Sequence, residues 1–390
     1  MFDSMFFYLF VTFLIFGIGD FLGVLSKAKV SAVFVSLILF LIGFMTGVLP
    51  PDVIARAELA GVGKWSTAFI VFHMGTMINI KELISEWRTV VTAVLSMVVV
   101  AAAGFALIPL IGYEETIVSI PIINGGIVAT QIMTTAALDK GFAMAAALGT
   151  ICYAIQKFIG TPVASFYGLK EAKKVVEEFR RTGVNPVKKA AAAEEKKEQT
   201  FAEKHAKFFG AFTCLAITGF FGWFAFCLGK MTGVSYSIWC LVLGAVVSYT
   251  GYIPARILEQ AKTSGFLNAA VFASIIPSLA RIKADDLITL GYSLIILFVI
   301  TLVVLFVCFY VLPLWKLVGS RNVAMGISVA QLLGFPATYL IANEIAQAST
   351  ETEEEKQVVL DAIMPKYLVA GFATVTSLSV IMAGILEKFL

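Results

Sequence analysis

Long apolar runs separated by short polar loops dominate this sequence. A transmembrane helix needs about 20 mostly apolar residues, and the pattern predicts ten such spans. They cover residues 4–25, 30–49, 64–80, 88–111, 141–167, 207–230, 234–250, 266–280, 287–315 and 362–387. The first run follows no basic residue and precedes no small-residue cleavage site, so we expect a retained span rather than a signal peptide. The pattern therefore predicts an all-α polytopic membrane protein.

Two further apolar stretches are interrupted by residues that break helices. Residues 114–140 contain Asn124-Gly125-Gly126, and residues 320–347 contain Gly334-Phe335-Pro336. Glycine permits unusual dihedral angles and close backbone approach, and proline stops a helix and frees a carbonyl group. Each stretch is therefore expected to hold two short helices joined by a break.

The charges of the loops indicate how these interrupted stretches lie. Basic loops tend to stay in the cytoplasm, which places 26–29 and 81–88 inside and the acidic loop 112–116 outside. If 114–140 crossed the membrane completely, segment 169–206 would lie outside, although it carries eleven of the 29 Lys and Arg residues, counting Lys207. A re-entrant hairpin at about 114–140, with its broken backbone buried in protein, removes this conflict.

The same reasoning applied to the second half predicts a second hairpin at about 320–347. Each half then has five spans and one hairpin: repeat 1 covers residues 1–168 and repeat 2 covers residues 207–390. Because five is odd, the two repeats have inverted topology. The charged linker 169–206 is expected in the cytoplasm, with both termini outside the cell membrane.

Short motifs recur in the same order in the two halves. Residues 126–131 read GIVATQ and residues 326–331 read GISVAQ, an offset of 200 residues. The dipeptides Ile-Lys and Pro-Leu also recur before and at the end of a long span, at 80–81 and 282–283, and at 109–110 and 313–314. Inverted repeats with broken helices in corresponding positions indicate the binding site of a secondary transporter.

Composition supports a membrane protein and disfavours several other classes. The chain is 59% hydrophobic with a mean hydropathy of +0.91, and only 14% of its residues are charged, whereas soluble domains have about 25%. The net charge of +3 is too small to suggest a nucleic-acid partner. The five cysteines have no metal-site or disulfide spacing, so no cofactor is expected.

Alternatives to a transporter find less support in the motifs. GxSxG and HExxH are absent, which argues against an enzyme, and no filter motif suggests a channel. A cation/proton antiporter or exporter of the same fold group stays open, although the hairpins carry no deeply placed pair of acidic residues.

Polar residues in the two hairpins are the candidates for binding solute and ions. The N-terminus of a half-helix attracts anions, and free carbonyl groups suit Na⁺. Each hydroxyl or amide could instead bond to its own helix. The candidates are Asn124, Gly125, Gly126, Thr130, Gln131, Thr134, Ser328, Gln331, Pro336, Thr338, Asn343 and Glu344, and the Na⁺ ligands are expected among them.

Gln131 and Gln331 are the most specific of these candidates because they end the two matching motifs. If the repeats are inverted copies, the two amides should approach a common site from opposite faces of the bilayer. Outside the hairpins, His73 is either a proton relay or a hydrogen-bonded packing residue. Lys157, which follows Gln156 within an apolar span, is either the counter-charge of a carboxylate or a snorkelling residue.

Several segments resemble the sodium:glutamate symporter family, which is related to the 2-hydroxycarboxylate (citrate) transporters. Residues 326–346 (GISVAQLLGFPATYLIANEIA) resemble its second hairpin, residues 364–386 its last span, and residues 69–83 (FIVFHMGTMINIKEL) another span. The resemblance implies a sodium-coupled, elevator-type homodimer that carries an acidic amino acid or a small carboxylate.

Cysteine-accessibility labelling in intact cells tests the predicted topology. We expect a membrane-impermeant reagent to label cysteines placed near either terminus and to leave cysteines in the linker 169–206 unlabelled. Labelling of the linker from outside would contradict the hairpin at 114–140.

Overall fold

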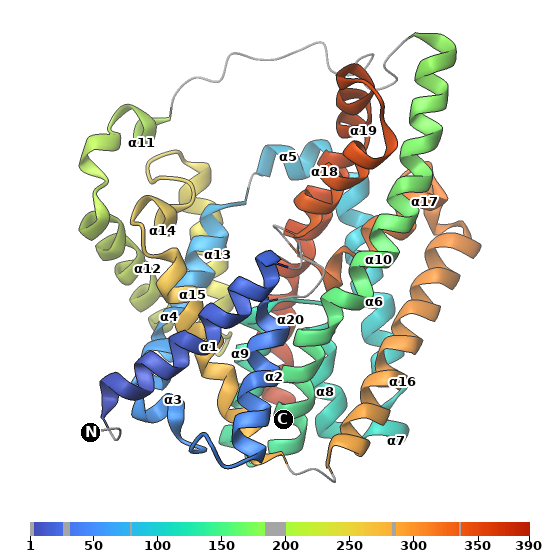
Figure 1. Cartoon of the computed structure of the whole chain (residues 1–390). Coiled ribbons are helices and arrows are strands. Elements are labelled where there is room, and N and C mark those ends of the chain that lie inside the picture. Colours follow the sequence, from blue (N-terminus) through green and yellow to red (C-terminus); the bar gives the residue numbers. More distant parts are fainter. Residues whose placement is uncertain (1–3, 26–31, 79, 184–199, 283–285, 335–336) are drawn as a thin grey trace.

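The computed structural model describes residues 4–25, 32–78, 80–183, 200–282, 286–334 and 337–390. Over these residues every regular element is helical and no strand occurs (Figure 1). The elements before the linker are α1 (Met5–Leu25), α2 (Ala32–Met45), α3 (Val53–Arg56), α4 (Leu59–Thr76), α5 (Ile80–Ser85), α6 (Trp87–Phe105), α7 (Ile108–Ile111), α8 (Tyr113–Ile123), α9 (Ile127–Asp139) and α10 (Ala143–Thr182).

In the described residues the second half also has ten α-helices, together with seven short 3₁₀- or π-helical segments. They are α11 (Phe201–Lys204), η1 (Ala206–Phe208), α12 (Ala211–Thr232), α13 (Tyr236–Tyr249), α14 (Ile257–Gln260), α15 (Ser264–Ile275), η2 (Ile276–Arg281), α16 (Asp286–Phe306), η3 (Val307–Val311), η4 (Pro313–Leu317), α17 (Arg321–Ser328), η5 (Val329–Leu332), α18 (Ala337–Ser349), α19 (Glu353–Gly371), η6 (Phe372–Leu378), α20 (Ser379–Leu386) and η7 (Glu387–Phe389). Of these, η3 and η6 are π-helical.

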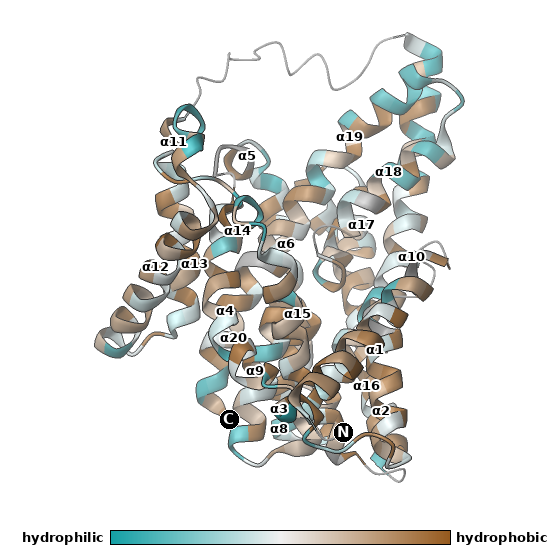
Figure 2. Cartoon of the chain, turned by 60° about the vertical axis from the view of Figure 1, so that its left-hand side comes forward, coloured by the Kyte–Doolittle hydropathy of each residue, from teal (hydrophilic) through white to brown (hydrophobic). Residues whose placement is uncertain are grey.

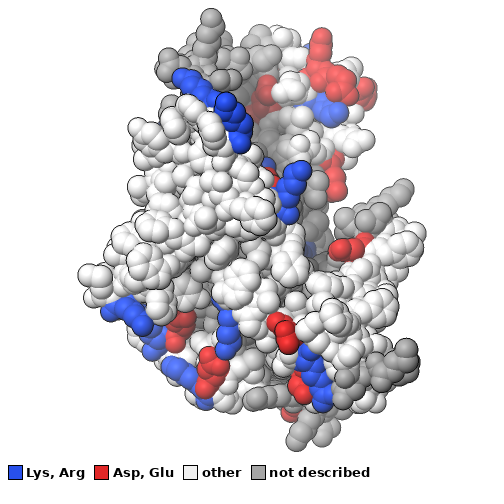
Figure 3. All heavy atoms as spheres, turned by 90° about the vertical axis from the view of Figure 1, so that its left-hand side faces the viewer, with Lys and Arg blue, Asp and Glu red and all other residues white. Residues whose placement is uncertain are grey.

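Six helical segments are long and apolar enough to cross a membrane. They lie in α1, α6, α10, α12, α16 with η3, and α19 through η7. Shorter apolar helices coincide with other expected spans, in α2, α13 and α15. Hydrophobic residues cover the middle of the molecule in Figure 2, and a broad band in Figure 3 carries no charged side chain. The chain is therefore an all-α polytopic membrane protein, which confirms the coarse prediction from the sequence.

The two halves share a local backbone feature that the sequence motifs did not reveal. Each contains a four-residue helix followed by a longer one, α3 with α4 and α14 with α15. Two positions after each short helix stands a non-glycine residue in the left-handed region, Glu58 (φ 57°) and Lys262 (φ 56°). Such residues are uncommon, and these two are alike in standing between a four-residue helix and a longer one.

The helices pack in two groups that stand side by side in Figure 1. The first helix group contains α1 to α4 and α12 to α15, and the second contains α6, α8 to α10 and α16 to α20. Within the first group, Gly75 of α4 faces Gly244 of α13. A Cβ atom on Gly75 would lie 2.4 Å from the carbonyl oxygen of Leu241, and one on Gly244 would lie 2.3 Å from that of Phe72. Glycine thus permits close contact between these two helices.

Both interrupted stretches form pairs of short helices. Hairpin 1 consists of α8 and α9 joined at Asn124-Gly125-Gly126. Hairpin 2 consists of α17, η5 and α18, and η5 is followed by a non-helical residue, Gly334. Hairpin 1 lies in the lower part of Figure 1, and hairpin 2 lies in the upper part. All residues from Thr116 to Ile123 are buried, so the surrounding helices enclose this arm of hairpin 1.

The structure corrects the predicted equivalence of the two glutamines. Gln131 lies on α9, after the break of hairpin 1, whereas Gln331 lies on η5, before the break of hairpin 2. The helices after the two breaks begin at Ile127 and Ala337, so their first residues are 210 residues apart rather than 200. The GIVATQ and GISVAQ motifs therefore occupy different arms.

The expected domain boundary at residue 168 falls inside a continuous helix. Helix α10 runs on to Thr182 and ends at Gly183 in the left-handed conformation (φ 63°), a common helix terminator. Residues 184–199 of the linker lie outside the described part of the chain. Its last residue before α11, Thr200, forms a capping box with Glu203. The division into repeats and linker stays a prediction.

Candidate functional site

A cavity of about 240 Å³ lies where the two helix groups meet near the hairpin tips. Both groups and both hairpins contribute to its wall. The lining residues are Ile70, His73, Met74 and Met77 of α4, Glu259, Ser264 and Asn268 of α14 and α15, Gly125 to Val128 of hairpin 1, Tyr153, Gln156 and Lys157 of α10, Leu333 of hairpin 2, and Val375 of η6.

The tips of the two hairpins converge on Val375. A Cβ atom on Gly126 would lie 2.6 Å from Val375 Cγ1, and one on Gly334 would lie 2.8 Å from the same atom. Gly334 also has a φ of +69°, which disfavours other residues. Val375 stands in the π-helical segment η6, and such segments are frequent at functional sites. The glycines at the two tips thus allow hairpin 1, hairpin 2 and η6 to come into contact.

The first turn of α9 forms part of the cavity wall. Gly126 is its N-cap residue, and no side chain caps the helix. The first amide groups of a helix have no partner within the helix, and they carry partial positive charge. Ile127 and Val128, which belong to this turn, line the cavity. The cavity therefore presents a helix N-terminus to a ligand.

Gln156 holds this tip against α10. Its Nε2 donates a hydrogen bond of 2.8 Å to the carbonyl oxygen of Gly125. Its Oε1 is buried and has no partner among the described residues. An unpaired buried acceptor is costly, so Oε1 is available for a donor or a cation that enters the cavity.

Lys157 brings a positive charge to the same wall. Its Nζ lies 5.8 Å from the centre of the Tyr153 ring, one helical turn earlier, within the range of a cation–π contact. No carboxylate lies within 4 Å of this ammonium in the described part of the chain. The Lys157 side chain is half-buried, and a charge removed from water without a counter-charge is costly. Binding of an anion in the cavity would reduce that cost.

The opposite wall carries His73, held in one orientation by the backbone. Its Nδ1 accepts a hydrogen bond of 3.3 Å from the N–H of Leu258, and Thr76 Oγ1 accepts one of 3.4 Å from the N–H of Ile257. These two bonds satisfy amide groups at the start of α14. Because Nδ1 accepts, the proton of the neutral imidazole stands on Nε2. His73 is thus a hydrogen-bonded packing residue that also borders the cavity.

Glu259 adds a carboxylate at the same wall. It pairs with Arg256 at 3.5 Å, so its charge is partly balanced within the first helix group. The cavity therefore has an unpaired cation on α10 and a paired anion on α14. This arrangement favours a ligand with net negative charge.

The predicted glutamines lie outside this lining and connect helices instead. Gln131 Oε1 accepts a hydrogen bond of 2.8 Å from Thr67 of α4, and its Nε2 donates to Thr135 at 3.2 Å. Gln331 Oε1 accepts one of 3.3 Å from Ser96 of α6. Gln331 Nε2 has no partner among the described residues.

Of the other hairpin candidates that the structure describes, only Gly125 and Gly126 line the cavity. Most of the remaining side chains bond to their own helix: Asn124 to Ile120, Thr130 to Gly126, Thr134 to Gln131, Ser328 to Met325 and Asn343 to Tyr339. Thr338 is buried with an unpaired Oγ1, Glu344 is exposed on α18, and Pro336 lies outside the described residues.

Sequence reasoning noted Gln156, Lys157 and His73 but left their roles open, and it missed Glu259, Ser264 and Asn268. The available signal was a single polar residue within an apolar helix, which applies to Asn268 in α15 as it does to His73 in α4. Comparison of the sequence with models of known families and with curated proteins finds no match in either case.

Replacement of His73 tests its structural role. We expect His73→Ala to lower the melting temperature of the purified protein, because it leaves the buried N–H of Leu258 unpaired at a cost of about 1–3 kcal/mol. His73→Asn should lower the melting temperature less, because the Oδ1 of the new side chain can accept a hydrogen bond from the same N–H. Thermal unfolding in detergent measures this, with Lys204→Ala, which replaces an exposed residue of α11, as the control. Equal melting temperatures for His73→Ala and the control would contradict the assignment.

Proposed function

We propose that this protein is a secondary active transporter that carries a small anionic solute through the cavity at Lys157. The observation that carries the proposal is an ammonium group without a counter-charge beside an uncapped helix N-terminus, at the point where two broken hairpins meet. Half-helices that end at mid-membrane are the usual means by which transporters bind charged solutes.

Inverted repeats belong to this proposal. The similar pairs α3–α4 and α14–α15, and the position of the two hairpins at opposite ends of the molecule, support two halves of opposite orientation. With five spans in each half, the site would lie near a pseudo-two-fold axis in the membrane plane. The resemblance to the sodium:glutamate symporters adds the expectation of a homodimer.

Binding would proceed through residues of α10 and hairpin 1. The anionic group would approach Lys157 Nζ and the amide groups of the first turn of α9. A polar donor elsewhere on the solute would be accepted by Gln156 Oε1. Movement of the second helix group relative to the first would then carry the solute, as the elevator mechanism of the resembled family requires, because residues of both groups border the cavity.

Sodium is the proposed coupling ion. Neutral oxygen atoms are the ligands that hard cations prefer, and Asn124 Oδ1 and Thr338 Oγ1 are buried oxygens without a partner in the described residues. Proton coupling is the alternative, and the position of His73 and Glu259 on the cavity wall favours it. An acidic amino acid or another small carboxylate is the proposed solute class.

Neutralisation of Lys157 tests the anion site. We expect Lys157→Gln to weaken solute binding by about 10-fold or more, since a charge-assisted hydrogen bond contributes about 1.5–3 kcal/mol, and Lys157→Arg to retain part of the affinity. Binding to purified protein measures this, with Lys173→Gln, an exposed lysine on the same helix, as the control. Unchanged affinity in Lys157→Gln would place the anion site elsewhere.

Uptake into proteoliposomes tests the coupling ion. We expect an inward Na⁺ gradient to drive accumulation of an acidic amino acid or small carboxylate at constant pH. A proton gradient in Na⁺-free buffer should not replace it. Full uptake under that second condition would favour the proton-coupled alternative and the residues His73 and Glu259.

A further inference from the structure

The charged end of α10 continues beyond its apolar part and contacts the base of hairpin 2. From Lys170 to Thr182 this helix has eight charged residues, and we call this segment the α10 extension. It leads directly to the linker and stands beside α17 and α19 at the upper end of Figure 1. The contacts of the extension therefore lie outside the membrane-spanning part of the helix.

Glu171 attaches the beginning of hairpin 2. Its Oε2 accepts hydrogen bonds from Ser320 Oγ at 2.5 Å and from Asn322 Nδ2 at 3.3 Å. Ser320 is also the N-cap of α17, where its Oγ accepts from the N–H of Val323 at 3.5 Å. One carboxylate of the extension thus fixes the residue at which the first arm starts.

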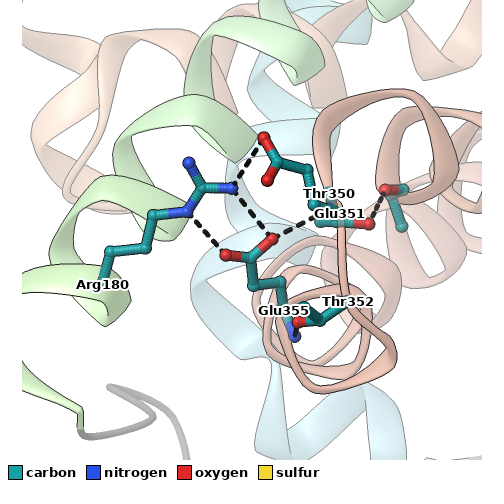
Figure 4. Close-up of polar contacts among 6 residues, drawn as sticks. Arg180, Thr350, Glu351, Thr352 and Glu355 are labelled. Carbon is teal, nitrogen blue, oxygen red and sulfur yellow. Dashed lines mark hydrogen bonds and ion pairs between the residues drawn. The ribbon is translucent and has the colours of Figure 1, made fainter.

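Arg180 attaches the end of hairpin 2, where α18 passes into α19 (Figure 4). Its Nε donates to Glu355 Oε1 at 2.6 Å, its Nη2 donates to Glu355 Oε2 at 3.1 Å, and the same Nη2 lies 3.3 Å from Glu351 Oε1. Glu355 also accepts the N–H of Glu351 at 2.9 Å. This bidentate pair is the strong form of an arginine–carboxylate contact.

Both members of the pair stay charged at physiological pH. The Arg180 guanidinium and the N–H of Glu351 hold the pKa of Glu355 at about 2, below its ordinary value. The contribution of this carboxylate to stability is therefore complete above its ordinary pKa and is lost only as the pH falls toward 2. The contact acts as a fixed attachment rather than a pH switch.

Between base and tip, hairpin 2 packs on glycines of α10. A Cβ atom on Gly160 would lie 2.9 Å from Leu332 Cβ, and one on Gly168 would lie 2.2 Å from Ile345 Cδ1. Gly160 is about one helical turn after Lys157, and Leu333 at the tip lines the cavity. Contact between α10 and hairpin 2 is thus continuous from the extension to the cavity.

We propose that Glu171 and Arg180 are positioning residues that fix hairpin 2 to α10, so that Leu333 and Lys157 form one rigid wall of the cavity. The proposal rests on the proposed function in treating the cavity as the solute site. Loss of either attachment lets the base of hairpin 2 separate from α10 and exposes its tip. Solute affinity then falls because the wall beside Lys157 is no longer held, whereas the maximal transport rate changes less.

The labelling rate of a cysteine at the hairpin tip tests this directly. The protein is the full chain with its five native cysteines replaced and Leu333→Cys as the reporter, purified in detergent and reacted with a soluble maleimide. We expect Glu171→Ala and Arg180→Gln to raise the labelling rate by about threefold or more. Matched controls on the same extension, Glu177→Ala and Arg181→Gln, should label at the parent rate.

Conservative variants keep the test decisive if the larger changes disturb folding. Arg180→Lys keeps the charge but loses the bidentate geometry, and its labelling rate should lie between those of the parent and Arg180→Gln. In proteoliposomes, Arg180→Gln should raise KM for uptake more than it lowers the maximal rate. Parent-like labelling in folded Glu171→Ala, Arg180→Gln and Arg180→Lys would overturn the proposal. Absence of uptake in the parent would instead count against the proposed function and leave the labelling result valid.

Discussion

Peptide groups cannot remain unpaired in hydrocarbon. The structure at the centre of this molecule depends on how the peptide groups at two helix breaks are hydrogen-bonded and enclosed. At hairpin 1 the side chain of Gln156 pairs with the carbonyl oxygen of Gly125. At both tips glycine lets the backbone press against Val375. The broken segments are therefore enclosed by protein, and the space left between them is a cavity bordered by polar groups rather than a hole filled with lipid.

The same cost of unpaired polar groups applies to the charge of Lys157 in this cavity. Lys157 stands on the helix that pairs with the hairpin tip, yet no carboxylate of the described residues balances it. An ammonium fully in water would need no partner, but a half-buried one loses part of its hydration and is stabilised by a partner. In the transporter that we propose, an anionic solute would provide that partner only while it is bound. Such differential stabilisation is what a transporter needs to couple solute binding to conformation.

Helix α10 connects these features along its length. It contacts hairpin 1 through Gln156, presents Lys157 to the cavity, packs on hairpin 2 at Gly160 and Gly168, and reaches the base of hairpin 2 through its charged extension. Polar residues of α10 make the contacts at the hairpin tip and in the charged extension, and glycines make the contacts between them. This distribution follows from the bilayer, which makes close packing of small residues the favourable contact at depth and leaves strong ion pairs to the aqueous end.

Hydropathy was sufficient to predict the helical membrane protein and its long apolar helices, because the requirement for apolar residues in lipid acts on each segment separately. The topology deduced from loop charge stays a prediction. Gly125 and Gly126 were found in the same way, since a break at depth is visible in the sequence. The sequence did not predict on which arm of each hairpin the two glutamines lie. The matching motifs around Gln131 and Gln331 lie on different arms. The cavity wall was also beyond reach, since His73, Lys157 and Asn268 come from helices far apart in the sequence. Their proximity arises from the packing of the two helix groups, which only the tertiary structure decides.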